Sequence, residues 1–176
     1  MQSLEFLRAW RERVRALEEQ LPGPARLPAA AEAEAALSRG EPLISLVEPP
    51  IDPDRFAALL ADLAALYAES RAEARALAAG LAELPPEGRR DLAQALLRDG
   101  DSAAWAARLG ADDDLLLTLG CLALQPFMAR FARAVREIAP LQGWRRIQCP
   151  VCDAAPDLCR IDPDNIRYLH CPQCDT

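Results

Sequence analysis

Two Cys-Pro-x-Cys pairs close to the C-terminal end limit what this chain can fold into. Cys149 and Cys152 form the first pair, Cys171 and Cys174 form the second, and residues 153–170 separate them. This spacing is typical of four-cysteine metal sites, in which two Cys-x-x-Cys turns direct four thiolates at one ion. The spacing therefore predicts one zinc or iron ion held by these four cysteines. A redox-active dithiol and incidental thiols are the alternatives.

The segment between the pairs predicts a β-hairpin. The short runs LCRI and IRYLH are divided by the turn-forming sequence Asp162-Pro163-Asp164-Asn165. Such a hairpin would bring the two Cys-x-x-Cys turns face to face. Asp153 and Asp175 directly follow the pairs, where the backbone is often left-handed, and Asp is among the few residues other than glycine that tolerate this conformation.

Three further residues are weaker candidates for the metal site. The only histidine, His170, directly precedes Cys171. Adjacent strand residues point to opposite faces, so we expect His170 at the surface or beside the ligands, not among them. We interpret Cys159 as a small strand residue and Cys121 as a buried residue of a central helix, with ligation as the alternative.

Four thiolates around a divalent ion carry a net charge of about −2, so nearby basic residues are expected to compensate it. The candidates are Arg145, Arg146, Arg160 and Arg167.

The rest of the sequence predicts a mainly α protein. Hydrophobic residues make up 51% of the chain but aromatic residues only 5%, because alanine and leucine supply most of the apolar content. Both residues favour helices. Periodicity, capping residues and prolines predict helices near residues 3–21, 28–39, 52–84, 87–98, 102–109 and 112–139. A break near Gly80 is an alternative for the third helix, and Pro126 is expected to interrupt or kink the last. We therefore predict a helical domain over residues 1–143 and a small metal-binding domain over residues 144–176.

Charge and hydropathy bear on partners and location. The net charge is −7, which does not fit the basic surface that nucleic-acid binding requires. The most apolar run, residues 115–128, is short and contains Thr, Gly, Gln and Pro, so we expect no membrane insertion. The N-terminal sequence does not resemble a signal peptide, and we expect a cytoplasmic protein.

The sequence offers no recognisable catalytic set. One histidine cannot form a histidine acid–base pair, and neither a His-Glu-x-x-His motif nor a paired Glu-x-x-His motif occurs. A glycine-rich phosphate loop is also missing. We therefore predict that the protein is not an enzyme.

The stretches CPVCDAAPDL and IRYLHCPQCDT, after a helical part that contains LALQPFMARFA, resemble the formate dehydrogenase accessory proteins. Members of that family have a helical N-terminal domain followed by rubredoxin-like Cys-x-x-Cys knuckles that hold iron or zinc. The matching residues are Cys149, Cys152, Pro156, Arg167, Tyr168, Leu169, Cys171, Cys174 and Thr176. Asp153 stands where the family usually has glycine. Family members continue with further Cys-x-x-Cys pairs, so the resemblance implies that the metal-binding domain here is shortened.

The resemblance implies a non-enzymatic maturation factor that binds the catalytic subunit of formate dehydrogenase in the cytoplasm during assembly. The alternative is a rubredoxin-like module for electron transfer or iron binding, because Cys-Pro-x-Cys turns also suit an iron tetrathiolate. A nucleic-acid-binding zinc ribbon is a third interpretation, which the acidity of the chain disfavours.

Overall fold

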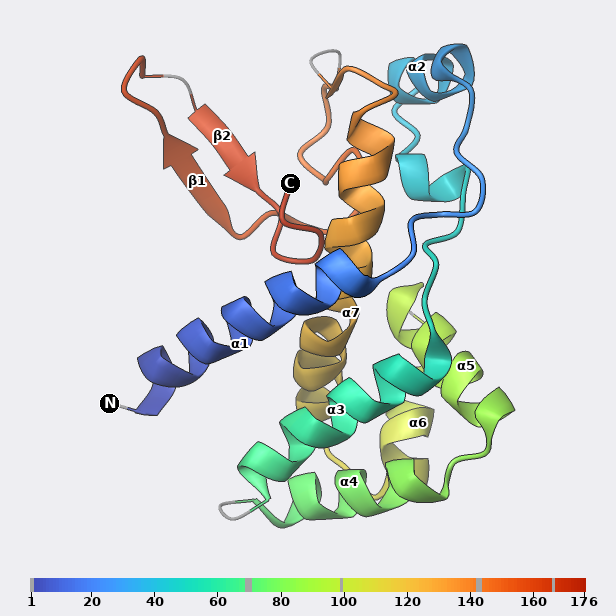
Figure 1. Ribbon diagram of the computed structural model, residues 1–176, viewed down its shortest axis with the longest axis vertical. Coiled ribbons are helices and arrows are strands. Elements are labelled where there is room, and N and C mark those ends of the chain that lie inside the picture. The colour runs from blue at the N-terminus through green and yellow to red at the C-terminus, as the bar shows by residue number, and fades with distance from the viewer. Residues whose placement is uncertain (1, 69–70, 99, 142–143, 166) are drawn as a thin grey trace. The chain divides into compact units, whose positions relative to one another are not determined.

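The fold is described from a computed structural model, which describes residues 2–68, 71–98, 100–141, 144–165 and 167–176 (Figure 1). Contacts between Cα atoms divide the chain into two compact units. One unit combines Met1–Pro50 with Gln125–Thr176, and the other is Ile51–Leu124. The predicted boundary between residues 143 and 144 falls at residues 142–143, which lie outside the described residues.

The unit Ile51–Leu124 is helical. It contains α3 (Pro53–Tyr67), α4 (Ala72–Glu83), α5 (Pro86–Leu97), α6 (Ser102–Leu109) and the first half of α7 (Asp113–Arg136). Helix α3 contacts both α4 and α5, and α4 contacts α6. The centre of this unit is formed by fully buried apolar side chains, among them Phe56, Leu60, Leu63, Leu77, Leu92 and Leu116.

Acidic side chains cap these helices. The Asp52 carboxylate accepts hydrogen bonds from the backbone N–H groups of Asp54 (3.0 Å) and Arg55 (3.1 Å), and Pro53 occupies the first helical turn. The Asp101 carboxylate caps α6 in the same way, through the N–H of Ala104 at 2.9 Å. Such caps satisfy donors that the helix itself leaves unpaired, and they explain why these helices begin where they do.

One predicted helix is two helices. The sequence pattern indicated a single helix near residues 52–84 with a possible break near Gly80, but α3 ends at Tyr67 and α4 begins at Ala72. Gly80 lies inside α4, where a Cβ atom would lie 3.0 Å from Cδ2 and 3.2 Å from the carbonyl oxygen of Leu109. The glycine therefore permits close packing of α4 against the end of α6 and does not break the helix.

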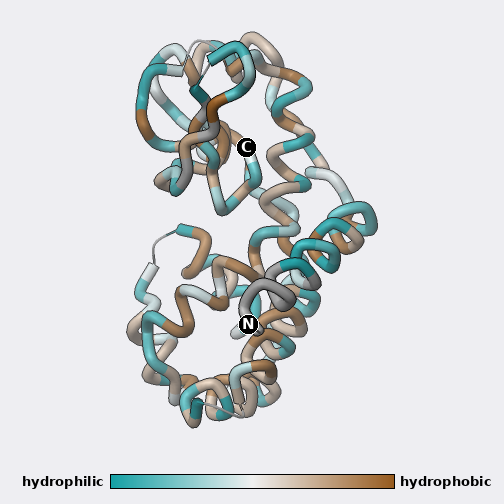
Figure 2. The backbone as a smooth tube through the Cα atoms, turned by 90° about the vertical axis from the view of Figure 1, so that its left-hand side faces the viewer, coloured by the Kyte–Doolittle hydropathy of each residue, from teal (hydrophilic) through white to brown (hydrophobic). Residues whose placement is uncertain are grey.

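The other unit carries the cysteine pairs. It contains α1 (Gln2–Gln20), α2 (Ala30–Ser38), the short 3-10 helix η1 (Leu43–Ser45), the second half of α7, and the strands β1 (Leu158–Ile161) and β2 (Arg167–His170). Its fully buried side chains include Leu43, Phe127, Met128 and Phe131. Figure 2 shows hydrophobic residues (brown) recurring along the helices, as the prediction of a mainly α protein requires.

Helix α7 is continuous from Asp113 to Arg136, with Pro126 inside it, so the proline does not interrupt the helix. By length and composition alone this helix, which extends beyond the apolar run 115–128, could cross a membrane. However, 61% of its most apolar 18-residue window is buried inside the protein. A core helix of a globular protein passes the same test of length and hydropathy.

We expect the Gly80→Ala substitution to lower the free energy of unfolding by about 1–2 kcal/mol, even though alanine is the better helix former. The new methyl group meets the backbone of Leu109, which cannot move aside as a side-chain end can, and overpacking of this kind outweighs the gain in helix propensity. Urea unfolding followed by circular dichroism measures the change.

Gly88→Ala in α5 is the matched control, because the three atoms nearest to a methyl group there are side-chain atoms of Leu84 and Pro85, at 3.3 Å or more. We expect it to be nearly neutral. Equal losses in the two variants would contradict this account of Gly80.

Candidate metal centre

The two Cys-x-x-Cys turns, here called knuckles, span residues 149–154 and 171–176 and share one hydrogen-bond pattern. In the first knuckle the Cys149 N–H donates to the Ala154 carbonyl (2.9 Å), and the Asp153 N–H donates to the Cys149 carbonyl (3.0 Å). In the second, the Cys171 N–H donates to the Thr176 carbonyl (2.9 Å), and the Asp175 N–H donates to the Cys171 carbonyl (3.0 Å). Each knuckle is thus a closed turn that holds both of its cysteines in fixed positions.

The residue after each second cysteine has a left-handed backbone, as predicted. The φ angle is 65° at Asp153 and 56° at Asp175. This conformation lets the chain reverse directly after the second sulfur of each pair. A β-branched side chain would be strained at either position.

The predicted hairpin joins the knuckles. Strands β1 and β2 are antiparallel, with Leu158 opposite His170 and Ile161 opposite Arg167. At the turn, the Asn165 N–H donates to the Asp162 carbonyl at 3.0 Å. Because the strands run in opposite directions, the end of β1 nearest the first knuckle lies beside the end of β2 that leads into the second.

The four cysteine sulfurs converge. Sγ of Cys149 lies 3.5 Å from Sγ of Cys174, and Sγ of Cys152 lies 3.5 Å from Sγ of Cys171. All four sulfurs lie within 4.8 Å of one another. A tetrahedral ion with metal–sulfur bonds of about 2.3 Å needs sulfurs about 3.8 Å apart, whereas a disulfide needs about 2.05 Å. The four cysteines can therefore hold one metal ion tetrahedrally.

Burial and mutual contact perturb these thiols. Cys149, Cys171 and Cys174 are buried, and Cys152 is half-buried. A hydrogen bond with Cys149 lowers the pKa of Cys171, and one with Cys152 lowers the pKa of Cys149. Contacts with Cys149 raise the pKa of both Cys152 and Cys174. The contacts thus favour the thiolate at Cys149 and Cys171 and the protonated thiol at Cys152 and Cys174. A metal cation that displaces the remaining protons would let all four sulfurs bind it as thiolates.

Backbone hydrogen bonds attach the first knuckle to η1. The N–H groups of Leu43 and Ile44 donate to the carbonyls of Pro150 (2.9 Å) and Val151 (2.8 Å). The side chain of Val151 is fully buried. This knuckle is therefore packed against a segment more than a hundred residues earlier in the chain.

A side chain attaches the second knuckle to α7. The Gln125 amide nitrogen, in α7, donates to the Pro172 carbonyl at 3.1 Å. Sequence reasoning did not single out Gln125, because nothing in its local pattern points to a residue so far along the chain. Each knuckle thus has its own attachment to the helical part of the same unit.

His170 lies outside the group of four cysteines that the described residues form. Its Nδ1 lies 3.1 Å from Oδ1 of Asp157, and its Nε2 lies 3.0 Å from Oδ1 of Asp175. The hydrogen bond with Asp175, followed by that with Asp157, raises the pKa of His170. The imidazole therefore links the start of the hairpin to the second knuckle, beside the sulfurs and not among them.

The two other cysteines are not part of the sulfur cluster. Cys159 lies on β1 and is exposed. Cys121 is exposed on α7, so the expectation of a buried residue there was wrong. The position of Cys121 on a largely apolar helix suggested burial. However, this part of α7 is buried on one side only, and Cys121 lies on its exposed side.

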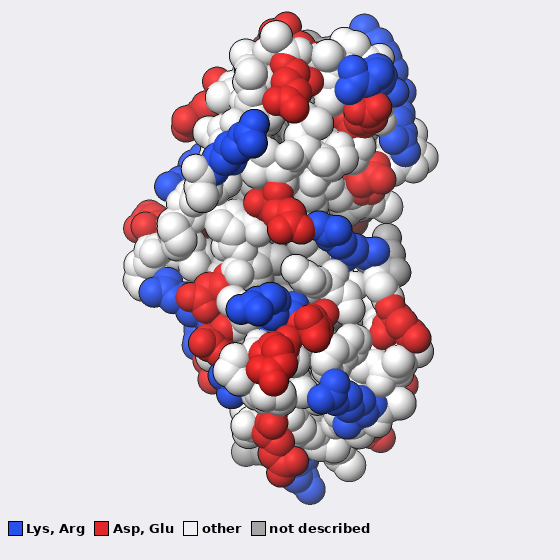
Figure 3. Space-filling model, turned by 90° about the vertical axis from the view of Figure 1, so that its right-hand side faces the viewer, with Lys and Arg blue, Asp and Glu red and all other residues white. Residues whose placement is uncertain are grey.

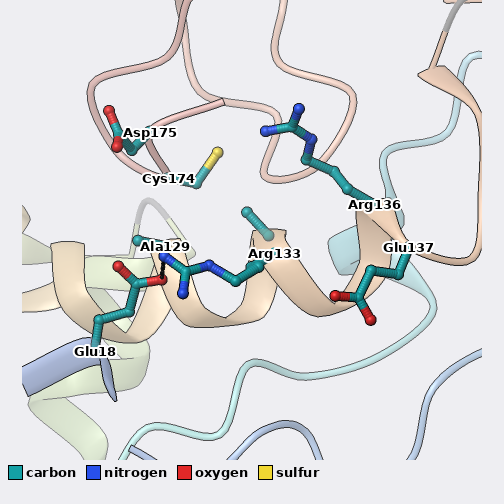
Figure 4. Close-up of a pocket in the computed structure, with 8 residues that line it drawn as sticks. Glu18, Ala129, Arg133, Arg136, Glu137, Cys174 and Asp175 are labelled. Carbon is teal, nitrogen blue, oxygen red and sulfur yellow. Dashed lines mark ion pairs between the residues drawn. The ribbon is translucent and has the colours of Figure 1, made fainter. Parts of the chain in front are cut away.

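A polar cavity of about 490 Å³ adjoins Cys174 (Figure 4). Glu18 of α1 lines it with only 6% of its surface exposed, and its carboxylate pairs with the guanidinium of Arg133 at 2.7 Å. The burial of Glu18 could have been predicted from the sequence, because Glu18 follows Trp10 and Val14 at helical spacing and so lies on the buried face of α1.

Of the arginines expected to offset the negative charge of the cluster, Arg146 lies next to the first knuckle. Arg146 lies 3.7 Å from Asp153 and donates to the Gly40 carbonyl at 2.7 Å.

On the face shown in Figure 3, basic and acidic side chains are interspersed. This distribution agrees with the net charge of −7 and offers no broad basic surface on that face for a phosphate backbone.

The fold and the site define a mainly helical protein with a four-cysteine cluster that can hold one metal ion. Comparison of the chain with protein-family models, with curated proteins and with solved structures found no match. The resemblance to formate dehydrogenase accessory proteins therefore stays a prediction carried by the C-terminal residues.

We expect Cys171→Ser to weaken metal binding by at least ~100-fold, because loss of a ligand should exceed the effect of losing a residue that only supports one. Titration of the reduced protein with Co²⁺, followed by the sulfur-to-cobalt charge-transfer band, measures both affinity and stoichiometry. Cys159→Ser removes a thiol from the same hairpin but not from the cluster, and should bind like the parent. Equal binding by both variants would contradict the four-cysteine site.

We expect removal of the metal by a chelator to expose the knuckle amides to hydrogen exchange. Without the ion, the closely spaced sulfurs repel or must share protons, and residues 144–176 bury too little apolar area to stay folded alone. Protection should fall at the N–H groups of the knuckles and also at Leu43 and Ile44, which donate to the first knuckle. Amides of α3 to α6 should keep their protection, and their simultaneous loss would disprove a metal effect confined to the knuckles and their attachments.

Proposed function

We propose that this protein is a non-enzymatic accessory factor that binds the catalytic subunit of formate dehydrogenase in the cytoplasm while that enzyme is assembled. The observation that carries the proposal is the convergence of the four cysteines within 4.8 Å, at the positions that match the family motif. The residues 167–169, which complete the motif, lie on β2 and lead directly into the second knuckle.

The proposed metal is zinc or iron, bound by four thiolates. Sulfur ligands in a tetrahedral arrangement suit both ions. When bound, the ion supplies a structural link between two turns that are far apart along the chain. The residues around it fix the shape: the knuckle amides hold the turns, Gln125 holds the second turn, and His170 joins Asp157 to Asp175.

Two features support a binding role over a catalytic one. The only histidine uses both ring nitrogens to join carboxylates of its own chain. The buried carboxylate of Glu18 is paired with Arg133. Both groups thus have structural partners within the same unit, as expected for a protein whose task is to present a surface.

A rubredoxin-like redox or electron-transfer module is the second candidate. Cys152 favours it, because this sulfur ligand is half-buried while the other three cysteines are buried, so the cluster approaches the surface on one side. Metal analysis of protein purified under reducing conditions separates the two candidates. A colourless protein with one equivalent of zinc would exclude the iron module, whereas iron with a reversible redox couple would support it.

We expect tagged parent protein to recover the catalytic subunit of formate dehydrogenase from an extract of formate-grown cells. Cys149→Ala and Cys171→Ala should lose this recovery, because the shaped surface depends on the metal cluster. Cys159→Ala, which leaves the cluster intact, should recover the subunit as the parent does. Failure of the parent to recover the subunit would overturn the proposed function.

A further inference from the structure

A groove of about 440 Å³ lies over the two knuckles and is lined mainly by the C-terminal segment. Its floor includes Cys149 and Cys171, both buried. The rest of its lining comes from the end of α7, the segment that precedes the first knuckle, and β2. We call it the knuckle groove, and its most prominent side chains are Arg136, Trp144, Arg146, Ile147, Arg167 and Leu169.

The knuckle groove is basic within an acidic protein. Three arginines line it, and none of the lining residues that the structure describes is Asp or Glu, although the chain carries a net charge of −7. Arg146 is held by the Gly40 carbonyl and by Asp153. The ion pairs found among the described residues do not include Arg136 or Arg167. In Figure 4 the guanidinium of Arg136 extends away from the carboxylate of Glu137.

The groove also exposes large apolar side chains. Ile147 is 73% exposed and Leu169 is 55% exposed. Arg167 and Leu169 are two residues apart on β2 and so lie on one face of the hairpin, together with Ile161 of β1, which pairs with Arg167 and is 57% exposed. This face of the hairpin therefore presents the charge of Arg167 next to the exposed apolar side chains of Ile161 and Leu169.

A role in offsetting the negative charge of the metal cluster would explain the arginines of the knuckle groove but not its exposed apolar side chains. Arginines that only offset the charge of four thiolates would need no exposed isoleucine or leucine next to them. Apolar side chains gathered beside unpaired guanidinium groups are instead characteristic of protein-binding surfaces, where arginine is enriched and pairs with carboxylates.

We propose that the knuckle groove binds a segment of a partner protein in which acidic and apolar residues alternate. Carboxylates of the segment pair with Arg136 and Arg167, and its apolar side chains cover Ile147 and Leu169. This inference deepens the proposed function, on which it rests for the identity of the partner, by assigning the contact surface and the chemistry of the segment it receives.

The test uses three short, fluorescently labelled synthetic peptides and the metal-loaded full chain. One peptide alternates leucine with glutamate, the second replaces each glutamate by lysine, and the third replaces each leucine by serine. We expect the first to bind in an anisotropy titration, more weakly as salt rises, and the other two to bind at least about tenfold more weakly. No binding of the first peptide, or equal binding of the first two, would overturn the proposal.

Charge variants locate the binding. The double variant Arg136→Gln, Arg167→Gln should weaken binding of the leucine–glutamate peptide about three- to tenfold while keeping the metal content of the parent. The control Arg71→Gln, Arg90→Gln makes the same change in charge in the unit Ile51–Leu124 and should bind like the parent. Equal weakening in both double variants would show a non-specific charge effect. Loss of metal from the groove variant would show that these arginines serve the sulfur cluster, and either result would overturn the proposal.

Subunit capture separates this proposal from the proposed function. If the parent and the groove variant recover the formate dehydrogenase subunit equally, the groove is not the contact surface, although the function stands. If the parent binds the leucine–glutamate peptide through the groove but recovers no such subunit, the groove stands and the proposed function fails.

Discussion

The C-terminal part of this protein depends on the close approach of four cysteine sulfurs, which cannot all be thiolates without a cation between them. The sulfurs lie within 4.8 Å of one another, and three of the four cysteines are buried. At that spacing four thiolates are unstable without a cation, and four protonated thiols gain little from their proximity. A bound ion would turn this unfavourable arrangement into a stabilising link, because it would join two turns separated by residues 153–170. The hairpin between the knuckles then has both ends fixed.

Hydrogen bonds also connect the two knuckles, and so the sulfur cluster, to the helices of the same unit. Leu43 and Ile44 donate backbone hydrogen bonds to the first knuckle, and the Gln125 side chain donates to the second. A change in the cluster therefore acts on η1 and α7 as well as on the hairpin. In this respect the metal-binding segment is part of a larger compact unit, which combines Met1–Pro50 with Gln125–Thr176. Periodicity in the sequence describes each segment by itself and does not show which segments meet, so these attachments could not be predicted from it.

The features that the sequence predicted are those that local chemistry determines. Cysteine spacing predicted the cluster, and the left-handed Asp153 and Asp175 follow from the turn that each pair must make. Features that depend on distant contacts were missed or misplaced. Gly80 suggested a break in a helix, yet it serves close packing against Leu109, and Cys121 is exposed because its side of α7 is left uncovered. Neither outcome can be read from the neighbouring residues.

The C-terminal end of α7 contributes positive charge to the knuckle groove of this acidic protein. Arg133 and Arg136 occupy its last turn, where positive charge complements the helix dipole. Burial of the Glu18 carboxylate would be costly without a partner, and Arg133 supplies one at 2.7 Å. That pairing uses the charge of Arg133 inside the unit, whereas Arg136, about one turn later, lines both the polar cavity and the knuckle groove. Two arginines that are equivalent in sequence thus act differently, because only one of them meets a buried acid.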